Sequence, residues 1–575
     1  MMMNKIFLAV LVSFFFVSFK QDGGVEKGAE ATAEKIYING KVLTVDQNNS
    51  VAQAVAVAEG KILAVGTTSD LLKLKNNKTQ VVDLKGKTLI PGFIDGHSHF
   101  MGLGAGRTAN LSPPPMGSVK NINDLVNVLV KFKKDNQIKD GEWISAFGYD
   151  TDQLAELRHP VKEDLDKAFP NNPLALTHAS GHMVVANSLA LKISGIDENT
   201  ADPAGGTIVR KGSTKEPTGL LQETAARLLK KGVAKKLTLE EKFEDLKKQQ
   251  ELYASVGITT AQDGLSSVES VELLKKASDA GILYIDIVAL PYFVHLDKLM
   301  ADSQYKFGSY DNHFKLGGFK LTADGSPQGK TAFFSKPYLT EVPGCNHDAC
   351  TGYANVTQET LNKAIVTGFK NNIQPFVHCN GDATVDMYIK AVENANKELG
   401  TSALERRPVV IHSQFVRPDQ LDQYKKLGLV PSFFTNHTFF WGDVHLRNLG
   451  KERAFFSSPL KSAIKRNITF TNHTDFRVTP ISQLFLLGSS VNRLSRTNVV
   501  IGPDERVTPA EGLRAITISG AYQYFEEKAK GSIEKGKLAD LVILSEDPTT
   551  IDPLKIKDIQ VLETIKGGKT VYLKK

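Results

Sequence analysis

Two histidines, His97 and His99, stand one residue apart directly after the apolar run LIPGFID. In an extended chain, residues i and i+2 point to the same face, so the two imidazoles can bind one metal ion together. A lone histidine is more often a hydrogen-bonded structural residue, so the pair needs further ligands from elsewhere in the chain. Asp95 shares the face of the pair one step deeper, and we expect it to support the site without ligating the metal.

Later apolar runs end on further residues of suitable chemistry, namely Lys320, His378, His412 and Asp475. Each of them alone is weak evidence, because a lysine at the end of a strand usually extends its ammonium to solvent. Taken together, neutral imidazoles and a carboxylate suit Zn²⁺ or a similar divalent metal ion.

Lys320 cannot bind a metal as an ammonium ion. Burial beside a dication lowers the pKa of its amine, and the neutral amine can then add CO₂ to form a carbamate that bridges two ions. One ion would be bound by His97, His99 and Asp475, and a second ion by His378 and His412. Lys320 would bridge the two ions. The metal's identity, and whether one or two ions bind, are left open.

Only a barrel brings these positions to one place. From about residue 250 onward, strand-like runs alternate with amphipathic runs such as SVESVELLKKASDAG, TQETLNKAIVTGFKNN and RPDQLDQYKKLG. Counting the run that ends at Phe93 as the first gives eight strands, which is typical of an α/β fold with a (β/α)₈ TIM-type barrel. We expect the barrel to span residues 91–526, with its chemistry at the carboxyl ends of the strands.

Both ends of the chain are rich in short β-strand patterns instead. Residues 34–90 contain hairpin signals at Asn39-Gly40 and Glu59-Gly60, and the last strands are expected to form a hairpin that turns at Gly567-Gly568. We therefore expect residues 34–90 and 527–575 to form one composite β-sandwich domain. In its sequence GKLAD, Asp540 is expected to stabilise a turn.

The stretch 103–245 breaks the alternation, so we interpret it as an insertion after the first barrel strand that covers the active face. His182, in SGHMVVANS, is expected to reach the pocket and contact the substrate or its oxyanion; the alternative is a histidine that caps a turn. Gln222, Glu223 and His437 are weaker pocket candidates, and Glu223 is better explained as a carboxylate on a helix face. The remaining histidines considered, together with one aspartate, are interpreted as structural or solvated: His159, His178, His295, His313, His445 and Asp324.

Several motifs resemble those of the amidohydrolase superfamily, in particular its YtcJ-like (amidohydrolase 3) branch. They are PGFIDGHSH, GFKLTADGS, VHCNGDATVD, VVIHSQFV and HTDFRVTP, together with ASGHMVVANSLAL, PTGLLQETA and KGSIEKGKLADLVIL. The resemblance spans roughly Lys35 to Tyr572 and implies a metal-dependent hydrolase barrel with a carboxylated Lys320. One departure is His473-Thr474-Asp475, where the family commonly has Ser-Asp; the metal ligand Asp475 is retained.

The metal set and the resemblance together predict hydrolysis of a C–N bond, in a non-peptide amide, N-acyl or N-formyl group of a small molecule. A metal-activated water would attack the carbonyl, and Asp475 would take its proton and pass it to the leaving amine. The residues expected to act in catalysis are Asp475, His412 and His182. Two alternatives stay open: a catalytically silent ligand-binding protein, and a metal-dependent esterase, lyase or isomerase using the same site.

Composition sets the remaining expectations. The net charge of +7 comes from scattered lysines, which favours a solvated surface over nucleic-acid binding. Residues 1–22 resemble a secretory signal, cleaved or kept as an anchor, although Phe19 stands where a lipid-bearing cysteine would be, so we expect export to the periplasm or the extracellular space. Cys345 and Cys350 could form a disulfide or stay free thiols, Cys379 is expected to be a buried apolar residue, and a homodimer is left open.

Overall fold

The structure is a computed structural model that describes residues 32–102, 108–114, 116–203, 205–230, 237–342, 345 and 349–575. The predicted signal segment, residues 1–22, lies outside the described residues. Within the described part, no helix combines the length and apolar character needed to cross a membrane.

The barrel strands form two five-stranded sheets among the described residues, with the orders β17-β18-β16-β15-β8 and β19-β20-β21-β22-β23. All neighbours are parallel except β17 (Tyr310–Asp311) and β18. The barrel strands are β8 (Phe93–Ile94), β15 (Ile258–Ser266), β16 (Asp286–Pro291), β18 (Phe314–Leu316), β19 (Phe319–Thr322), β20 (Pro375–Cys379), β21 (Val409–His412), β22 (Val430–Phe433) and β23 (Thr471–Asn472).

The two sheets meet along β18 and β19, which form one run interrupted at Gly317-Gly318. A Cβ atom on Gly318 would lie 2.2 Å from the Gln374 carbonyl oxygen, so the close approach of the neighbouring chain requires glycine there. A parallel bridge between Tyr292 and Lys320 joins the sheets at this point. On the other side, Asp475 N donates to the His97 carbonyl at 3.0 Å, which ties the end of β23 to the end of β8. The predicted TIM-type barrel is confirmed.

Helices follow the strands as the amphipathic runs predicted, and many begin with a side-chain cap. Ser267 caps α6 by accepting from Ser270 N, and Thr357 caps α8 by accepting from Thr360 N. The helices of the barrel region are α6 (Val268–Asp279), α7 (Leu296–Ala301), α8 (Gln358–Lys370), α9 (Asp382–Leu399), α10 (Pro418–Leu427), α11 (Asn436–Leu449), α12 (Lys451–Phe455), α13 (Leu460–Lys465), α14 (Gln483–Asn492), α15 (Pro509–Ala515) and α16 (Ile518–Gln523).

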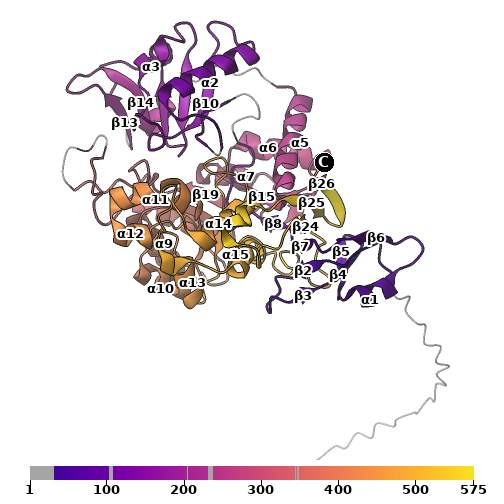
Figure 1. Ribbon diagram of the computed structural model, residues 1–575. Coiled ribbons are helices and arrows are strands. Elements are labelled where there is room, and N and C mark those ends of the chain that lie inside the picture. The colour runs from indigo at the N-terminus through magenta and orange to yellow at the C-terminus, as the bar shows by residue number, and fades with distance from the viewer. Residues whose placement is uncertain are drawn as a thin grey trace, which may run out of the picture.

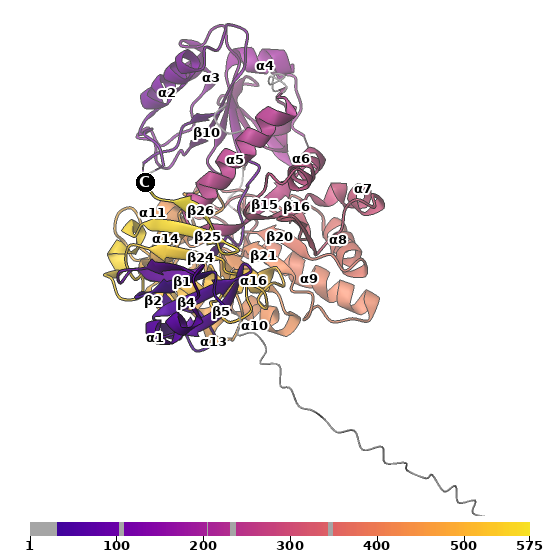
Figure 2. The same cartoon turned by 90° about the vertical axis from the view of Figure 1, so that its right-hand side faces the viewer.

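Two further sheets are built from the ends of the chain, and in Figures 1 and 2 the indigo and yellow strands lie side by side. One has the order β5-β4-β1-β6 and the other β26-β25-β24-β7-β2-β3, so the second combines both ends. The strands are β1 (Lys35–Ile38), β2 (Lys41–Leu43), β3 (Val51–Ala52), β4 (Ala54–Ala58), β5 (Lys61–Gly66), β6 (Gln80–Asp83), β7 (Thr88–Pro91), β24 (Leu541–Leu544), β25 (Val561–Lys566) and β26 (Lys569–Leu573), with the short helix α1 (Thr68–Leu71).

The turn signals in these sheets had different outcomes. Glu59-Gly60 joins the paired strands β4 and β5, and Gly567-Gly568 joins β25 and β26, as predicted. The hairpin expected at Asn39-Gly40 is wrong: β1 pairs with β4 and β6, whereas β2 pairs with β3 and β7 in the other sheet. Asp540 accepts from Gly567 N at 2.9 Å, which supports the β25–β26 turn.

The predicted insertion contains a sheet of its own, with the order β13-β14-β12-β11-β10-β9. Figures 1 and 2 place this sheet and α2 at one end of the molecule, beyond the barrel from β1 to β6. Its elements are β9 (Ala109–Asn110), α2 (Ile122–Asp135), β10 (Ile144–Tyr149), α3 (Lys162–Asp166), β11 (Leu174–His178), β12 (Met183–Ala186), α4 (Ser188–Ser194), β13 (Gly206–Arg210) and β14 (Pro217–Glu223). After it, α5 (Leu239–Ser255) packs against β15, β25 and β26 and leads into the second barrel strand.

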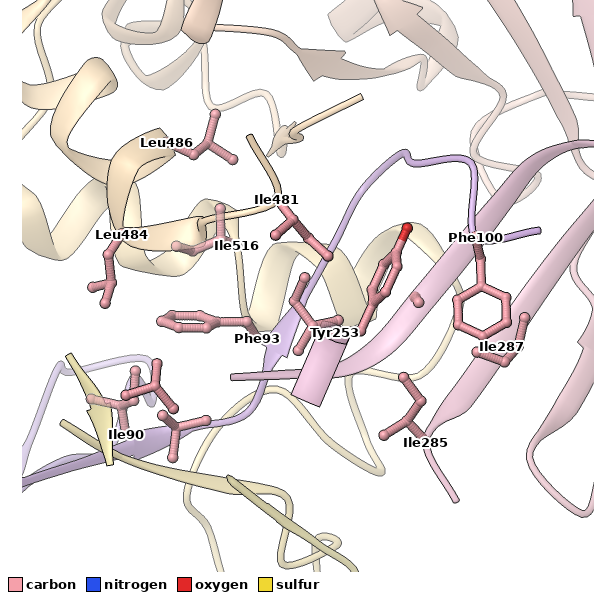
Figure 3. Close-up of a cluster of buried hydrophobic side chains, with 14 of the residues drawn as sticks. Ile90, Phe93, Phe100, Tyr253, Ile285, Ile287, Ile481, Leu484, Leu486 and Ile516 are labelled. Carbon is pink, nitrogen blue, oxygen red and sulfur yellow. The ribbon is translucent and has the colours of Figure 1, made fainter. Parts of the chain in front are cut away.

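One apolar cluster joins the first barrel strand to its surroundings (Figure 3). Phe93 of β8 is fully buried, and the rings of Phe100 and Tyr253 lie 5.2 Å apart in an edge-on contact. Ile90 and Ile516 belong to the same cluster. Burial of this surface, at about 25 cal/mol per Å² of apolar area, holds the segment that precedes His97 in place.

Candidate metal centre

Three of the predicted ligands face one point at the mouth of the barrel. His97 Nε2 and His99 Nε2 lie 3.6 and 3.3 Å from Asp475 Oδ1, and the ligand atoms of the three residues all lie within 4.8 Å of one another. Among the described residues, no hydrogen-bond donor satisfies the buried Oδ1 of Asp475. Lone-pair donors that converge on an unsatisfied carboxylate oxygen fit a divalent cation.

The other three predicted ligands adjoin this group. Lys320 Nζ lies 3.1 Å from His97 Nε2, and His412 Nε2 lies 4.0 Å from Asp475 Oδ2. The rings of His378 and His412 are 4.5 Å apart. The structure thus brings all six predicted ligands to one end of the barrel.

Burial sets the protonation of these groups. It lowers the pKa of His97 and His412 well below the usual histidine value, and it lowers the pKa of Lys320 to about 7. Burial alone would raise the pKa of Asp475, but the interaction with the neighbouring imidazole of His99 outweighs it and lowers that pKa. Neutral imidazoles, an ionised carboxylate and a buried amine that is about half unprotonated at neutral pH form a donor set for a metal ion.

Two of the histidines are oriented by partners that the sequence did not reveal as part of the site. Gln262 Oε1 lies 2.5 Å from His97 Nδ1, and Asp324 Oδ1 lies 3.1 Å from His378 Nδ1. Asp324 also accepts from Thr384 Oγ1 at 2.8 Å and from two backbone N–H groups at the start of α9. Such partners fix which ring nitrogen is free to bind a metal. Asp324 is a structural residue, as the sequence indicated, and the residue that it orients is the predicted ligand His378.

The residues around the departure motif form a second layer. His473 Nε2 lies 3.1 Å from His412 Nδ1, and burial lowers the pKa of His473 to about 3. Asp95 accepts from Thr474 Oγ1 at 2.6 Å and from Thr474 N, and burial raises its pKa to about 7. Asp95 therefore supports the loop that carries Asp475. This agrees with the role expected from its position one step deeper on the strand than the histidine pair.

The insertion closes the site from the other side. His182 and His437 line one small cavity together with His378, His412 and Asp475. His182 Nδ1 lies 2.9 Å from Glu223 Oε2. Burial opposes a charge on His182, but the Glu223 carboxylate outweighs it and raises the His182 pKa, while the charged imidazole lowers the pKa of Glu223. The two shifts favour an imidazolium paired with a carboxylate.

Two expectations about weaker pocket residues need correction. Glu223 was expected on a helix face, but it ends strand β14, and its side chain is 6% exposed. Its backbone has φ +50°, a conformation rare for a residue with a Cβ atom, which turns the carboxylate toward His182. Gln222, beside it, contacts Met183 and is not among the residues that line the cavity.

The cysteines complete the comparison with the sequence. Cys345 and Cys350 are joined by a disulfide, with their Cα atoms 6.2 Å apart. Cys379 is a free, buried thiol that contacts the apolar core, as expected.

Comparison with known proteins places this arrangement in a family. A sequence model described as "Amidohydrolase family" matches residues 80–572. The chain is 28% identical to an N-substituted formamide deformylase of Arthrobacter pascens, over 93% of this chain and 98% of the relative. It is 27% identical to the putative amidohydrolase YtcJ of Bacillus subtilis, over 94% and 99%.

A solved structure supports the same assignment. An uncharacterized metal-dependent hydrolase of Pyrococcus furiosus is 25% identical and superposes with a TM-score of 0.67, over 91% of this chain and 100% of that one. The family match covers most of the chain, and the barrel, the metal-type donor set and the fold of this hydrolase agree with it. The chain therefore belongs to the amidohydrolase family of metal-dependent hydrolases.

Proposed function

We propose that the protein hydrolyses the C–N bond of a small N-acyl compound, most specifically an N-formyl amide. The observation that carries the proposal is the position of Asp475, which faces the ligands His97 and His99 and also lines the cavity. The similarity to a relative described as an N-substituted formamide deformylase supports the formyl group.

The metal centre is proposed to hold one or two Zn²⁺ ions through His97, His99, Lys320, His378, His412 and Asp475. A divalent ion supplies Lewis-acid polarisation of the scissile carbonyl and lowers the pKa of a water molecule. Lys320 supports a bridging role, because an amine with a pKa of about 7 is about half unprotonated at neutral pH, and the neutral form can make an N–C bond to CO₂ with release of one proton.

Asp475 is proposed to move the proton. Its carboxylate accepts a proton from the attacking water while the water oxygen bonds to the acyl carbon. It then donates that proton to the nitrogen as the C–N bond breaks, which yields a carboxylic acid and an amine. The lowered pKa of Asp475 keeps the carboxylate ionised at the start of the cycle.

His182 is proposed to bind the carbonyl oxygen as negative charge develops on it. As an imidazolium held by Glu223, it is a donor at both ring nitrogens, and one of them is already committed to the carboxylate. A cationic donor that is fixed in place stabilises a developing oxyanion more than a freely solvated donor does.

We also propose that the protein acts outside the cytoplasm. The disulfide between Cys345 and Cys350 supports this location, because disulfides persist in oxidising compartments. Fractionation of cells that express the full chain checks it, and recovery of the protein entirely in the cytosolic fraction contradicts it.

The test of the function compares matched substrates on the purified full chain. One amine is supplied as its N-formyl and N-acetyl amides, and the corresponding alcohol as its formyl ester, with bound metal measured in the same sample. We expect the N-formyl amide to give the highest kcat/KM and ¹⁸O from labelled water to enter the formate. Binding of these compounds without turnover, in protein that carries metal, would favour the silent ligand-binding alternative. Faster turnover of the ester would favour the esterase alternative.

A further inference from the structure

One asparagine that lines the cavity has a buried side-chain oxygen without a donor. Asn380 directly follows β20, and the residue is 4% exposed. Among the described residues, no hydrogen-bond donor reaches its Oδ1. An amide oxygen can only accept a hydrogen bond, and most buried side-chain polar atoms have a partner. The position of this oxygen beside the cavity therefore suits a donor that a ligand brings.

The orientation of the Asn380 amide is fixed by its other contacts. Its Nδ2 donates to the Gly325 carbonyl oxygen at 2.9 Å, and turning the amide over would set two oxygens against each other. Nδ2 also lies 3.3 Å from His378 Nε2. The Asn380 backbone donates to Asp324 Oδ1 and accepts from Phe415 N, each at 3.0 Å. Every other polar group of the residue is thus engaged, and Oδ1 is held in place.

The loop after β19 supplies a second oxygen of this kind. Gln328 lines the same cavity and is 6% exposed, and within the described ranges its buried Oε1 has no donor. A missing donor is not sufficient evidence by itself. The Oδ1 atom of Asn436 is also buried without one in the described part of the chain, but Asn436 does not line the cavity. What distinguishes Asn380 and Gln328 is that both oxygens belong to the wall of the candidate site.

The Asn380 amide lies next to the groups proposed to act on the substrate. Its nearest ligand is His378, whose ring is 5.7 Å from the ring of His182, and Asp475 lines the same cavity. The cavity wall therefore combines a proposed oxyanion donor with two amide acceptors. A secondary amide presents a carbonyl acceptor and an N–H donor on adjacent atoms, whereas an ester or a tertiary amide has no N–H. The wall is complementary to the secondary amide.

We propose that Asn380 Oδ1 accepts a hydrogen bond from the N–H of the scissile amide. Asn380 is then a substrate-binding residue, and the preferred substrate is the acyl derivative of a primary amine. The inference rests on the proposed hydrolysis of a C–N bond. When Asp475 donates its proton to the nitrogen and the C–N bond breaks, the leaving amine carries two hydrogens, and Gln328 Oε1 accepts from the second.

The first test compares two substrates on the wild-type full chain loaded with Zn²⁺. They are N-butylformamide and N-butyl-N-methylformamide, which differ in the hydrogen on the nitrogen. A site built around a buried acceptor rejects a compound that leaves the acceptor unpaired. We expect kcat/KM to be higher for N-butylformamide by about 10- to 100-fold. Equal values for the two compounds overturn the proposal.

A variant separates the hydrogen bond from the bulk of the methyl group. Asn380→Ala removes the oxygen and makes room, so kcat/KM should fall for N-butylformamide and the ratio of the two substrates should approach unity. A loss of metal through the His378 contact would lower both rates and leave the ratio unchanged, and bound Zn²⁺ is measured in each sample. Asn436→Ala is the matched control, because it also removes a buried amide whose Nδ2 has a partner, Thr479 Oγ1 at 2.8 Å. Its substrate ratio should equal that of the wild type.

The outcomes separate this inference from the proposed function. If Asn380→Ala hydrolyses both formamides with the wild-type ratio, the role of Asn380 is wrong and the function stands. If the metal-loaded wild type hydrolyses neither compound, the function fails, and calorimetric Kd values for the same pair test the contact. Tighter binding of N-butylformamide that Asn380→Ala abolishes then supports the role of Asn380, and equal Kd values in the wild type overturn it.

Discussion

The cavity has two faces that differ in charge state. The barrel face supplies histidines whose pKa burial lowers, so they are neutral and keep lone pairs for a metal. The insertion face supplies His182, whose side chain is 17% exposed; Glu223 raises its pKa and so favours the cation. The same residue type therefore serves opposite chemistry on the two faces, and the partner of each ring decides which one it serves.

This difference assigns separate tasks to the two faces. A neutral ring with a free lone pair binds a cation, whereas an imidazolium repels a metal ion and binds a developing anion. Variants of the barrel face should change metal binding and turnover together, and variants of the insertion face should change turnover alone.

Asp475→Asn is the variant of the barrel face from which we expect the largest loss of activity. The amide keeps the shape of the side chain but can neither carry the proton nor supply an anionic ligand, so we expect kcat to fall by about 10²–10⁴-fold. The measurement is kcat together with bound Zn²⁺ by elemental analysis. A variant with more than a tenth of the wild-type kcat would remove Asp475 from proton transfer.

His182→Ala tests the insertion face, and the expected loss in kcat is about 10²–10³-fold, as for removal of an oxyanion donor. Bound metal should stay at the wild-type level, which distinguishes this variant from Asp475→Asn. His182→Gln, which keeps one donor, is the matched control and should recover part of the rate. Loss of metal from His182→Ala would mean that the two faces are not separate.

Glu223→Gln sharpens the comparison through pH. The active form of His182 is the protonated one, so activity should fall as the pH rises through its raised pKa. Removal of the Glu223 charge lowers that pKa, and the alkaline limb of the kcat profile should move to lower pH. The effect on kcat is largest at alkaline pH and small at acidic pH. An unchanged alkaline limb contradicts a cationic His182.

The sequence predicted the barrel face better than the insertion face, for a physical reason. Strand ends of a barrel meet at one mouth, so an apolar run followed by histidine is enough to place His378 or His412. Glu223 comes close to His182 only through the antiparallel sheet of the insertion and an unusual backbone turn, and PTGLLQETA contains no local sign of either. Gln262 and Asp324 likewise depend on contacts with residues 54 to 165 positions away.

The β-sheets at the ends of the chain teach the same lesson about local signals. Asn39-Gly40 turns the chain as the sequence indicates, but the partners of β1 and β2 are strands farther along, in two different sheets. A turn signal predicts a change of direction, whereas pairing is decided by which apolar faces are buried together.

The smallest expected effect concerns the contact that joins the two faces. Trp441 Nε1, on α11 of the barrel, donates to Asp150 Oδ2 of the insertion at 2.7 Å, and both side chains are buried. Trp441→Phe leaves that carboxylate with one partner fewer, so we expect unfolding to become easier by about 1–3 kcal/mol in urea denaturation. The metal ligands are untouched, so bound Zn²⁺ should not change, and any rise in KM should exceed the change in kcat. A loss of metal in this variant would show that the insertion helps to hold the barrel face, and the two faces would then have to be treated as one site.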